Sequence, residues 1–345
     1  MFIRKGYKII LIAGKDSFHN NFKSNKITKI FLPIDERGMN PFSEIKTILS
    51  LYRIYKKIKT DLIMHFTIKP NIYGSLVSKV LNIKSISFVT GIGHIFLKKK
   101  SLIKSLIIIV YKYALSGNKE VWFTNKSDKD LFIKNRIINN DTNARIVPGA
   151  GVVFKQYPMV SKKNNVISFL MIARIIKEKG VMEFLKIAGM YKNDPNITFT
   201  LIGALNENDR GSIDKEYLQK HIDNKAVIYS DYQEDVSNLL REASCIIHPS
   251  YREGISTVLL EAASTQTPII TTTVPGCIDV VPDESYGLLC KPRNVNSLKK
   301  AVDKFLSLDQ NRKDKMTSKT FLYVKKYFSR EVVLKNYERL DGYIN

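Results

Sequence analysis

The segment Val166-Ile-Ser-Phe-Leu-Met-Ile-Ala173 leads through Arg174-Ile-Ile-Lys-Glu-Lys179 into Gly180-Val-Met-Glu-Phe-Leu-Lys-Ile-Ala-Gly-Met190. The first part is a short apolar run, which is typical of a strand buried on both faces. The last part carries apolar residues at the spacing of an amphipathic helix. A strand, a loop and a helix in this order predict one βα unit of a parallel sheet.

The same alternation of short apolar runs and helical patterns continues along the whole chain, which predicts an α/β protein with parallel, doubly wound sheets. We expect further strands at Tyr7–Ala13, Ile27–Pro33, Leu62–Thr67, Ser85–Thr90, Glu120–Thr124, Ala144–Val147, Ile197–Ile202, Ala226–Ser230, Cys245–His248, Pro268–Thr272 and Gly287–Cys290. We expect further helices at Ser43–Lys59, Asn71–Leu81, Val236–Glu242, Ile255–Ser264, Val295–Leu308 and Arg330–Leu340.

A polar, turn-rich stretch divides the chain into two folding units. Pro148-Gly-Ala-Gly151 ends a predicted strand, and Pro158–Asn165 has the composition of a linker. We therefore expect an N-terminal domain over residues 1–155, a second domain over 156–328, and a C-terminal helical segment over 329–345 that packs back on the first domain.

The composition excludes several classes of protein. The chain has 345 residues and only three cysteines, which do not form the pairs that a disulfide scaffold or a structural zinc site needs. No apolar stretch is long enough to span a membrane, and the N-terminus lacks the pattern of a signal peptide. We expect a cytoplasmic protein.

The formal net charge of +23 leaves three interpretations open: a nucleic-acid partner, an anionic membrane surface, or a basic surface that reflects composition alone. No nucleic-acid-binding motif is present, so we expect no nucleic-acid partner. The segment Lys98–Leu115 places a basic cluster before an apolar helix that is too short to span a membrane. This helix either lies in the headgroup region of an anionic membrane or belongs to the core of the first domain.

Cationic side chains follow the first strand of the second half. In a doubly wound sheet, ligands lie at the carboxyl ends of the strands. Arg174 comes at such an end, and Lys179 precedes the next helix. A guanidinium and an ammonium at a helix N-terminus suit a diphosphate, although a solvated loop would have the same composition.

Two glutamates are separated by seven residues in His248-Pro-Ser-Tyr-Arg-Glu253-Gly-Ile-Ser-Thr-Val-Leu-Leu-Glu261. Glu253 follows a buried strand, Gly254 allows close approach of the backbone, and Ser256 and Thr257 begin a helix whose free N–H groups can bind an anion. A carboxylate at Glu261 can accept hydrogen bonds from a ribose diol. Paired carboxylates also occur in glycoside hydrolases, and an isolated pair can be two solvated helix residues. We expect His248 to be structural.

The E-x7-E pattern and its surroundings resemble the retaining glycosyltransferases of family 4, which have the GT-B fold. The matching residues are Ala173-Arg174, Lys179-Gly180, His248-Pro-Ser, Arg252-Glu253-Gly, Glu261-Ala, Pro268-Ile-Ile-Thr-Thr, Pro275-Gly-Cys and Tyr286-Gly-Leu-Leu. In the first half, Lys69–Leu76 and Thr90–Phe96 resemble enzymes that extend lipid-linked oligosaccharides. The resemblance implies two Rossmann-like domains that face a central cleft.

The resemblance also implies a role for each matching residue in transfer from a UDP-linked sugar. Arg174 and Lys179 would hold the diphosphate, Glu253 would face the sugar hydroxyls, and Glu261 would bind the ribose. Gly254, Ile255, Ser256 and Thr257 would complete the donor site. Lys69, Asn71, Gly91 and Gly93 would form an acceptor-side loop. Transfer would proceed with retention and without a metal or other cofactor.

The acceptor implied by the resemblance is a lipid-linked saccharide at the inner face of the cell membrane, in surface polysaccharide or glycan biosynthesis. The resemblance also implies a strand and a glycine-rich loop before the strand at Tyr7–Ala13, and this first βα unit is expected to be missing here. The missing unit motivates one alternative, a non-catalytic remnant that binds UDP-sugar. The other alternative is a nucleotide-sugar epimerase of the same fold.

Overall fold

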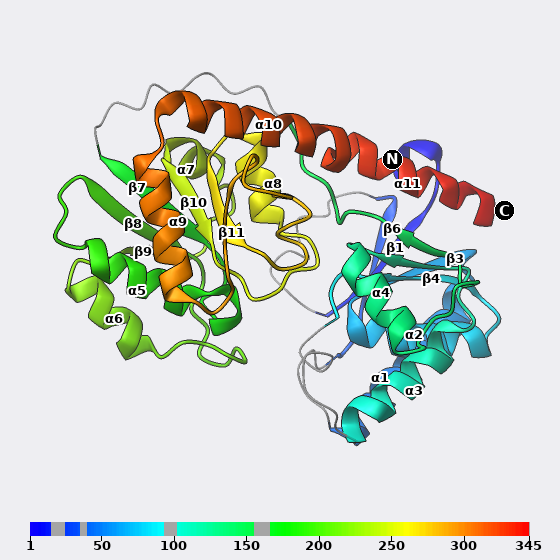
Figure 1. Ribbon diagram of the computed structural model, residues 1–345. Coiled ribbons are helices and arrows are strands. Elements are labelled where there is room, and N and C mark those ends of the chain that lie inside the picture. The colour runs from blue at the N-terminus through cyan, green and yellow to red at the C-terminus, as the bar shows by residue number, and fades with distance from the viewer. Residues whose placement is uncertain (15–24, 35–39, 93–101, 155–165, 345) are drawn as a thin grey trace. The chain divides into compact units, whose positions relative to one another are not determined.

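The computed structural model describes residues 1–14, 25–34, 40–92, 102–154 and 166–344. The chain forms two compact units (Figure 1). The first unit consists of Met1–Val147 and Leu334–Asn345, and the second consists of Pro148–Val333. The structure thus divides the chain after residues 147 and 333, where the sequence placed the boundaries after residues 155 and 328.

The second unit is built on one parallel sheet with the strand order β12-β11-β10-β7-β8-β9. The bounds of these strands are β7 Ile167–Ile172, β8 Ile197–Ile202, β9 Ile228–Ser230, β10 Cys245–His248, β11 Ile269–Thr272 and β12 Leu288–Cys290. The chain builds outward from β7 to β9, returns to pair β10 with β7, and then builds outward in the other direction. The strand order therefore reverses between β7 and β10, where doubly wound sheets bind their ligands.

Alternate residues of β7 enter two separate apolar clusters. Phe169 and Met171 pack in one cluster with Phe184 of helix α5 (Val181–Tyr191). Leu170 packs in the other cluster with residues that include Leu259 of helix α8 (Thr257–Ser264). Both faces of the sheet are therefore covered, which explains why its strands are continuous apolar runs. This arrangement confirms the predicted α/β class with parallel sheets.

The other helices of the second unit are α6 (Lys215–Asp223), α7 (Ser237–Glu242), α9 (Val295–Ser307) and α10 (Gln310–Phe328). Helices α6 and α10 were not predicted. Their sequences are polar, and the buried face of α10 includes two threonines, Thr317 and Thr320, so its apolar pattern is interrupted. Aspartates cap both helices, since Asp214 accepts from the backbone N–H of Tyr217 and Asp309 from that of Arg312.

The described strands of the first unit form two parallel sheets, one of β1 (Ile9–Ala13) and β2 (Ile27–Phe31) and one with the order β3-β4-β5-β6. The second sheet contains β3 Leu62–Phe66, β4 Lys84–Val89, β5 Glu120–Phe123 and β6 Ala144–Ile146. The helices are α1 (Pro41–Ile58), α2 (Ile68–Val80), α3 (Leu102–Leu115) and α4 (Lys126–Lys134), after a short 3-10 helix at Phe2–Lys5. Helix α2 packs against both α1 and α3. Among the described helices of both units, none is long and apolar enough to cross a membrane.

The C-terminal segment joins the first unit through a buried carboxylate. Helix α11 (Arg330–Glu338) is followed by a 3-10 helix at Arg339–Tyr343. Glu120 is fully buried and accepts hydrogen bonds from the indole of Trp122 at 2.6 Å and the hydroxyl of Tyr343 at 2.8 Å. Arg145 and Arg339 also contact this carboxylate, at 3.0 and 3.3 Å. These contacts confirm that the last segment packs back on the first domain.

We expect replacement of Glu120 by Gln to lower the free energy of unfolding of the first unit by about 3 kcal/mol. The amide would place its own N–H donors among N–H and O–H donors. Trp122, the only tryptophan of the chain, reports the transition by fluorescence during urea unfolding. Glu207→Gln removes an exposed carboxylate from the second unit and serves as the control. Equal transition midpoints for the two variants would contradict a stabilising role for Glu120.

Candidate active site

Lys179 reaches the switch point of the second sheet because a glycine follows it. Residues Lys177–Lys179 form a single 3-10 turn between β7 and α5. Gly180 has a φ of +79°, and a Cβ atom there would lie 2.1 Å from the carbonyl oxygen of Pro249. Only glycine fits such an approach in this backbone conformation. The start of α5 therefore packs directly on the chain that leaves β10.

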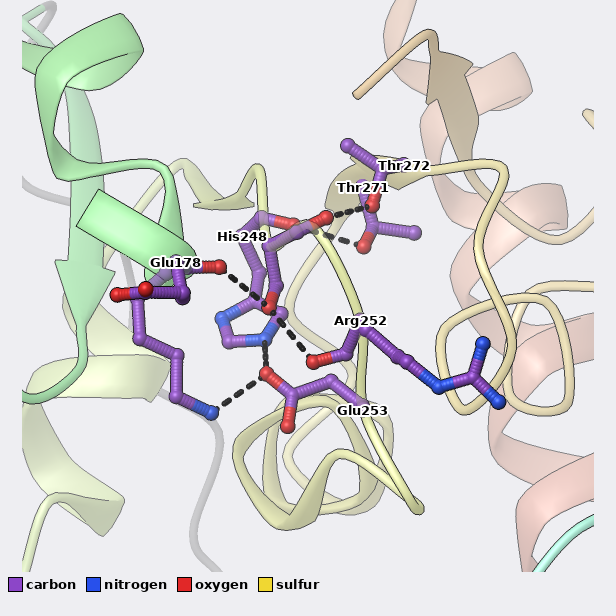
Figure 2. A network of polar contacts seen from close by, with 8 residues as sticks. Glu178, His248, Arg252, Glu253, Thr271 and Thr272 are labelled. Carbon is purple, nitrogen blue, oxygen red and sulfur yellow. Dashed lines mark hydrogen bonds and ion pairs between the residues drawn. The ribbon is translucent and has the colours of Figure 1, made fainter. Parts of the chain in front are cut away.

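Lys179, His248 and Glu253 form a compact cluster at this place (Figure 2). The Lys179 ammonium lies 2.6 Å from Oε1 of Glu253, and Nε2 of His248 lies 3.0 Å from the same oxygen. The side chains of His248 and Glu253 are only 3% and 11% exposed, whereas that of Lys179 is 22% exposed. Two cationic or N–H groups thus converge on one oxygen of a nearly buried carboxylate.

The loop that carries Glu253 is held by the loop that follows β11. The backbone N–H of Glu253 donates to the carbonyl of Pro275, and that of Ser256 donates to the carbonyl of Gly276, both at 3.2 Å. Gly276 has a φ of +80°, and a Cβ atom there would lie 2.6 Å from Cβ of Glu253. The two loops therefore fit only with glycine at this position.

Hydroxyl groups hold the backbone around the cluster (Figure 2). Thr271 donates to the carbonyl of His248 at 2.8 Å, and Thr272 donates to that of Ser250 at 2.5 Å. The Ser250 hydroxyl lies within reach of the carbonyls of Glu178 and Arg252, at 3.2 and 3.3 Å. The ends of β10 and β11 and the turn before α5 are thereby joined into one network, which restricts the geometry of the cluster.

Glu253 is ionised in this environment. Burial on its own raises the pKa of Glu253, but the hydrogen bond from His248 and the charge of Lys179 outweigh it and lower the pKa to about 2. The site therefore holds a carboxylate whose charge is partly matched by Lys179 and whose position is defined by two donors.

The structure does not bring Arg174 into this cluster. Its guanidinium is 63% exposed, and Nη1 lies 3.8 Å from Oδ2 of Asp209. Strand β7 ends at Ile172, and the buried side chains of Ile175 and Ile176 anchor the loop just before the 3-10 turn. Arg174 is thus an accessible cation near the carboxyl end of β7, as the sequence predicted, but the structure gives it a different partner from Glu253.

Glu261 has surroundings different from those of Glu253. With Thr257, Asp235 and Arg330, it lines a pocket of about 320 Å³ within the second unit. Burial, followed by the charge of Asp235, raises the pKa of Glu261. The pKa shifts of the two glutamates of the E-x7-E pattern therefore have opposite signs. This holds although the loop that carries Glu253 leads directly into the helix that carries Glu261.

The remaining predicted donor residues lie between the two glutamates. Gly254 and Ile255 are half-buried in the loop, and Ile255 packs against Gly149, where a Cβ atom would lie 2.7 Å from its Cγ2. Ser256 is buried at the N-cap of α8, and Thr257 is the first residue of the helix. Ser256 thus lies at the start of the helix, as predicted, but its side chain makes no capping hydrogen bond to α8.

The structure places Lys69 and Asn71 in a helix rather than in the predicted loop. Both lie in the first turn of helix α2, where Lys69 contacts Glu44 at 2.5 Å. Asn71 is fully buried and donates to the carbonyl of Phe88 at 3.0 Å. This hydrogen bond ties α2 to the sheet. Gly91 does lie outside the helices and strands, with open space where a Cβ atom would be. Gly93 lies outside the described residues.

His248 is the residue that sequence analysis assigned incompletely. Its place at the end of a strand suggested a structural role only, yet its Nε2 contacts Glu253 directly. The separation of five residues between them was a sequence feature that could have suggested a contact. The loop conformation that brings the two side chains together depends on Gly276, however, and could not be predicted from the local sequence. His65, by contrast, is buried and contacts the hydroxyls of Tyr55 and Ser75.

Glu253 should make the second unit sensitive to acid. Its folded-state pKa of about 2 lies below the reference value of 4.5, so its stabilisation is present above pH 4.5 and is lost as the pH falls toward 2. Between pH 7 and pH 3, we expect the native protein to lose about 2 kcal/mol more than Glu253→Gln. Urea unfolding followed by circular dichroism measures this difference. Glu207→Gln should follow the native protein, and parallel losses in all three proteins would contradict the low pKa.

Comparisons with known proteins agree on the kind of fold and family. Residues 155–321 match the model of the family described as glycosyl transferases group 1, and residues 1–125 match that of glycosyl transferase 4-like proteins. A glycosyltransferase of Rickettsia africae has a TM-score of 0.78 at 18% identity, covering 99% of this chain and 90% of that one. Anabaena Alr3699/HepE, solved with UDP and glucose, has a TM-score of 0.76 at 14% identity, covering 96% and 91%.

A curated relative aligns with a smaller part of the chain. It is the N,N'-diacetylbacillosaminyl-diphospho-undecaprenol alpha-1,3-N-acetylgalactosaminyltransferase of Campylobacter jejuni, 24% identical over 154 residues. The alignment covers 44% of this chain and 40% of the relative, so the chain spans less than half of that protein in the match. With a glycosyltransferase model on each half and structural neighbours of GT-B fold, the chain belongs to the glycosyltransferases.

Proposed function

We propose that the chain transfers a hexose or N-acetylhexosamine from a UDP-linked donor to a lipid-linked saccharide, with retention of configuration. The observation that carries this proposal is the cluster of Lys179, His248 and Glu253 at the switch point of the second sheet. Two similarities support it: a neighbour of the same fold was solved with UDP and glucose, and the curated relative is named for a diphospho-undecaprenol substrate.

In this proposal, different residues bind the diphosphate, the sugar and the ribose of the donor. Lys179 and Arg174 bind the diphosphate and stabilise the negative charge that develops on it as the sugar leaves. Glu253 accepts hydrogen bonds from the sugar hydroxyls, and Glu261 accepts them from the ribose. The backbone between Gly254 and Thr257 supplies N–H groups at the start of α8.

Without a protein nucleophile, retention requires that the acceptor attack the face from which the diphosphate departs. The acceptor oxygen forms a bond to the anomeric carbon, the bond from that carbon to the diphosphate oxygen breaks, and the acceptor proton passes to a phosphate oxygen. No protein nucleophile takes part. We propose that Arg174 and Lys179 supply the required positive charge and that no divalent metal is needed, so that EDTA leaves the rate unchanged.

Transfer can be tested with UDP-N-acetylhexosamines, UDP-glucose and a polyprenyl-diphosphate-linked saccharide in detergent. We expect UDP release to depend on the acceptor, and nuclear magnetic resonance to find the donor's anomeric configuration in the product. Glu253→Ala and Arg174→Ala should each lower kcat by about 100-fold or more, because the first removes the carboxylate that holds the sugar hydroxyls and the second removes positive charge that stabilises the departing diphosphate. Lys177→Ala, which removes an exposed cation of the same loop, is the control.

Other outcomes of this experiment separate the alternatives. Saturable UDP binding without turnover would identify a binding remnant, and conversion of the UDP-sugar without an acceptor would identify an epimerase. Full activity of Glu253→Ala would contradict the assignment of the donor site.

We also propose that the first unit binds an anionic membrane surface at the inner face of the cell membrane, through the segment Lys98–Leu115. Residues 98–101 lie outside the described residues. On helix α3, Leu106, Ile109 and Tyr113 are more than half exposed at the spacing of one helix face. Lys112 is exposed next to them. An apolar face beside lysines suits insertion into the headgroup region of anionic lipid.

Helix α1 has a similar exposed face. Phe42, Ile45 and Leu49 are at least half exposed at the same spacing, and Lys46 is exposed beside them. Since α2 packs against both α1 and α3, these faces belong to one group of helices. The proposed surface therefore includes α1, and it accounts for part of the net positive charge.

Sedimentation with vesicles tests the membrane surface. We expect the protein to pellet with phosphatidylglycerol vesicles, less with neutral vesicles, and less as salt rises, because exposed charges are screened. The double variant Leu106→Ser, Ile109→Ser should bind at least about tenfold more weakly, since it removes apolar side-chain area that the membrane would bury. Ile228→Ser, which changes an exposed apolar residue of the second unit, is the matched control. Unchanged pelleting of the α3 variant would exclude this helix.

A further inference from the structure

We propose that His248 is a positioning residue. It is the neutral tautomer with its single ring proton on Nε2, and it holds Oε1 of Glu253 so that Oε2 is directed toward the donor sugar. This inference rests on the proposed function for its catalytic consequence. The contact itself rests only on the geometry of the second unit, where Nε2 lies 3.0 Å from Oε1.

The proton on Nε2 follows from the partners of Glu253. Lys179 donates to Oε1 at 2.6 Å, and a carboxylate can only accept hydrogen bonds. Nε2 of His248 must therefore be the donor in its own contact with Oε1. The position of this proton is thus assigned by the neighbouring charge rather than by the histidine alone.

The absence of a proton on Nδ1 follows from its burial. Within the described residues, Nδ1 of His248 is buried and has no hydrogen-bond partner. An imidazolium would place an N–H group there without an acceptor, and this costs more than leaving a lone pair unsatisfied. The neutral tautomer with the proton on Nε2 is the form that fits both nitrogens.

The same geometry argues against proton transfer to substrate by His248. One ring nitrogen is committed to Glu253, and the other is buried. The side chain of His248 is only 3% exposed, so the surrounding atoms leave the ring little room to turn. The side-chain contacts of Glu253 with Lys179 and His248 both reach Oε1, and Figure 2 shows Oε2 turned away from His248. Oε2 is the oxygen left to receive hydroxyl groups of a sugar.

Two variants of His248 separate positioning from packing. His248→Gln can place an amide N–H near the position of Nε2, whereas His248→Leu fills the space without a donor. We expect His248→Leu to lower kcat for transfer by roughly 10- to 100-fold with KM for the UDP-sugar within about threefold, and to move the acid limb of the kcat profile to higher pH. His248→Gln should restore kcat to within about threefold of the native protein. Equal losses in both variants, or a native pH profile in His248→Leu, would overturn the proposal.

A second measurement does not depend on activity. In protein with ¹⁵N-labelled histidine, nuclear magnetic resonance should find His248 neutral at pH 7 with the proton on Nε2. Acid unfolding should show a smaller pH-dependent loss of stability in His248→Leu than in the native protein, because the pKa of Glu253 rises without its donor. A protonated imidazolium or a proton on Nδ1 would overturn the assignment. If these results hold while the native protein transfers no sugar, the proposed function fails and the contact stands.

Discussion

The parallel pairing of β7 with β10 is the constraint on which the second unit depends. Phe169 lies opposite Cys245, and Leu170 opposite Ile246, so two strands far apart in the sequence end at the same edge of the sheet. The chain has already built β8 and β9 on one side when it returns to form β10 on the other. The residues of the candidate donor site follow one of these strand ends or begin the next helix, except Glu261, which lies within α8.

Backbone contact then sets how close these residues come. Gly180 lies against the Pro249 carbonyl, and Gly276 lies against Glu253. Larger residues at either position would separate the segments that carry Lys179 and Glu253. The charges gain from this closeness, because a nearly buried carboxylate needs compensating donors. The cluster is therefore a consequence of packing first and of electrostatics second.

Burial explains the polar residues that do not belong to the site. Glu120 is fully buried and satisfied by groups from β5, β6 and the C-terminal segment, so it connects the end of the chain to the first unit. The family resemblance implied an acceptor-side role for Asn71, yet its side chain is buried and donates to a strand carbonyl. Both are polar residues whose role depends on which distant groups surround them.

The basic side chains have several different environments in this structure. Lys179 is tied to Glu253, while Arg174 stays largely exposed and close to Asp209. Other lysines lie beside exposed apolar side chains on α1 and α3. The net charge of +23 therefore cannot be assigned to one partner, since neighbours decide whether a lysine binds an anion, pairs with a carboxylate or is solvated.

The sequence by itself determined the strands, because strands buried on both faces are apolar runs that need no knowledge of their neighbours. The predicted bounds Ile197–Ile202 and Cys245–His248 are those of the structure. It also located Glu253 and Lys179 at strand and helix ends. Only the tertiary structure decided that these two meet across 74 residues of chain, that His248 joins them, and that Arg174 does not. These outcomes depend on crossovers and loop contacts between distant segments, which local patterns of polarity do not encode.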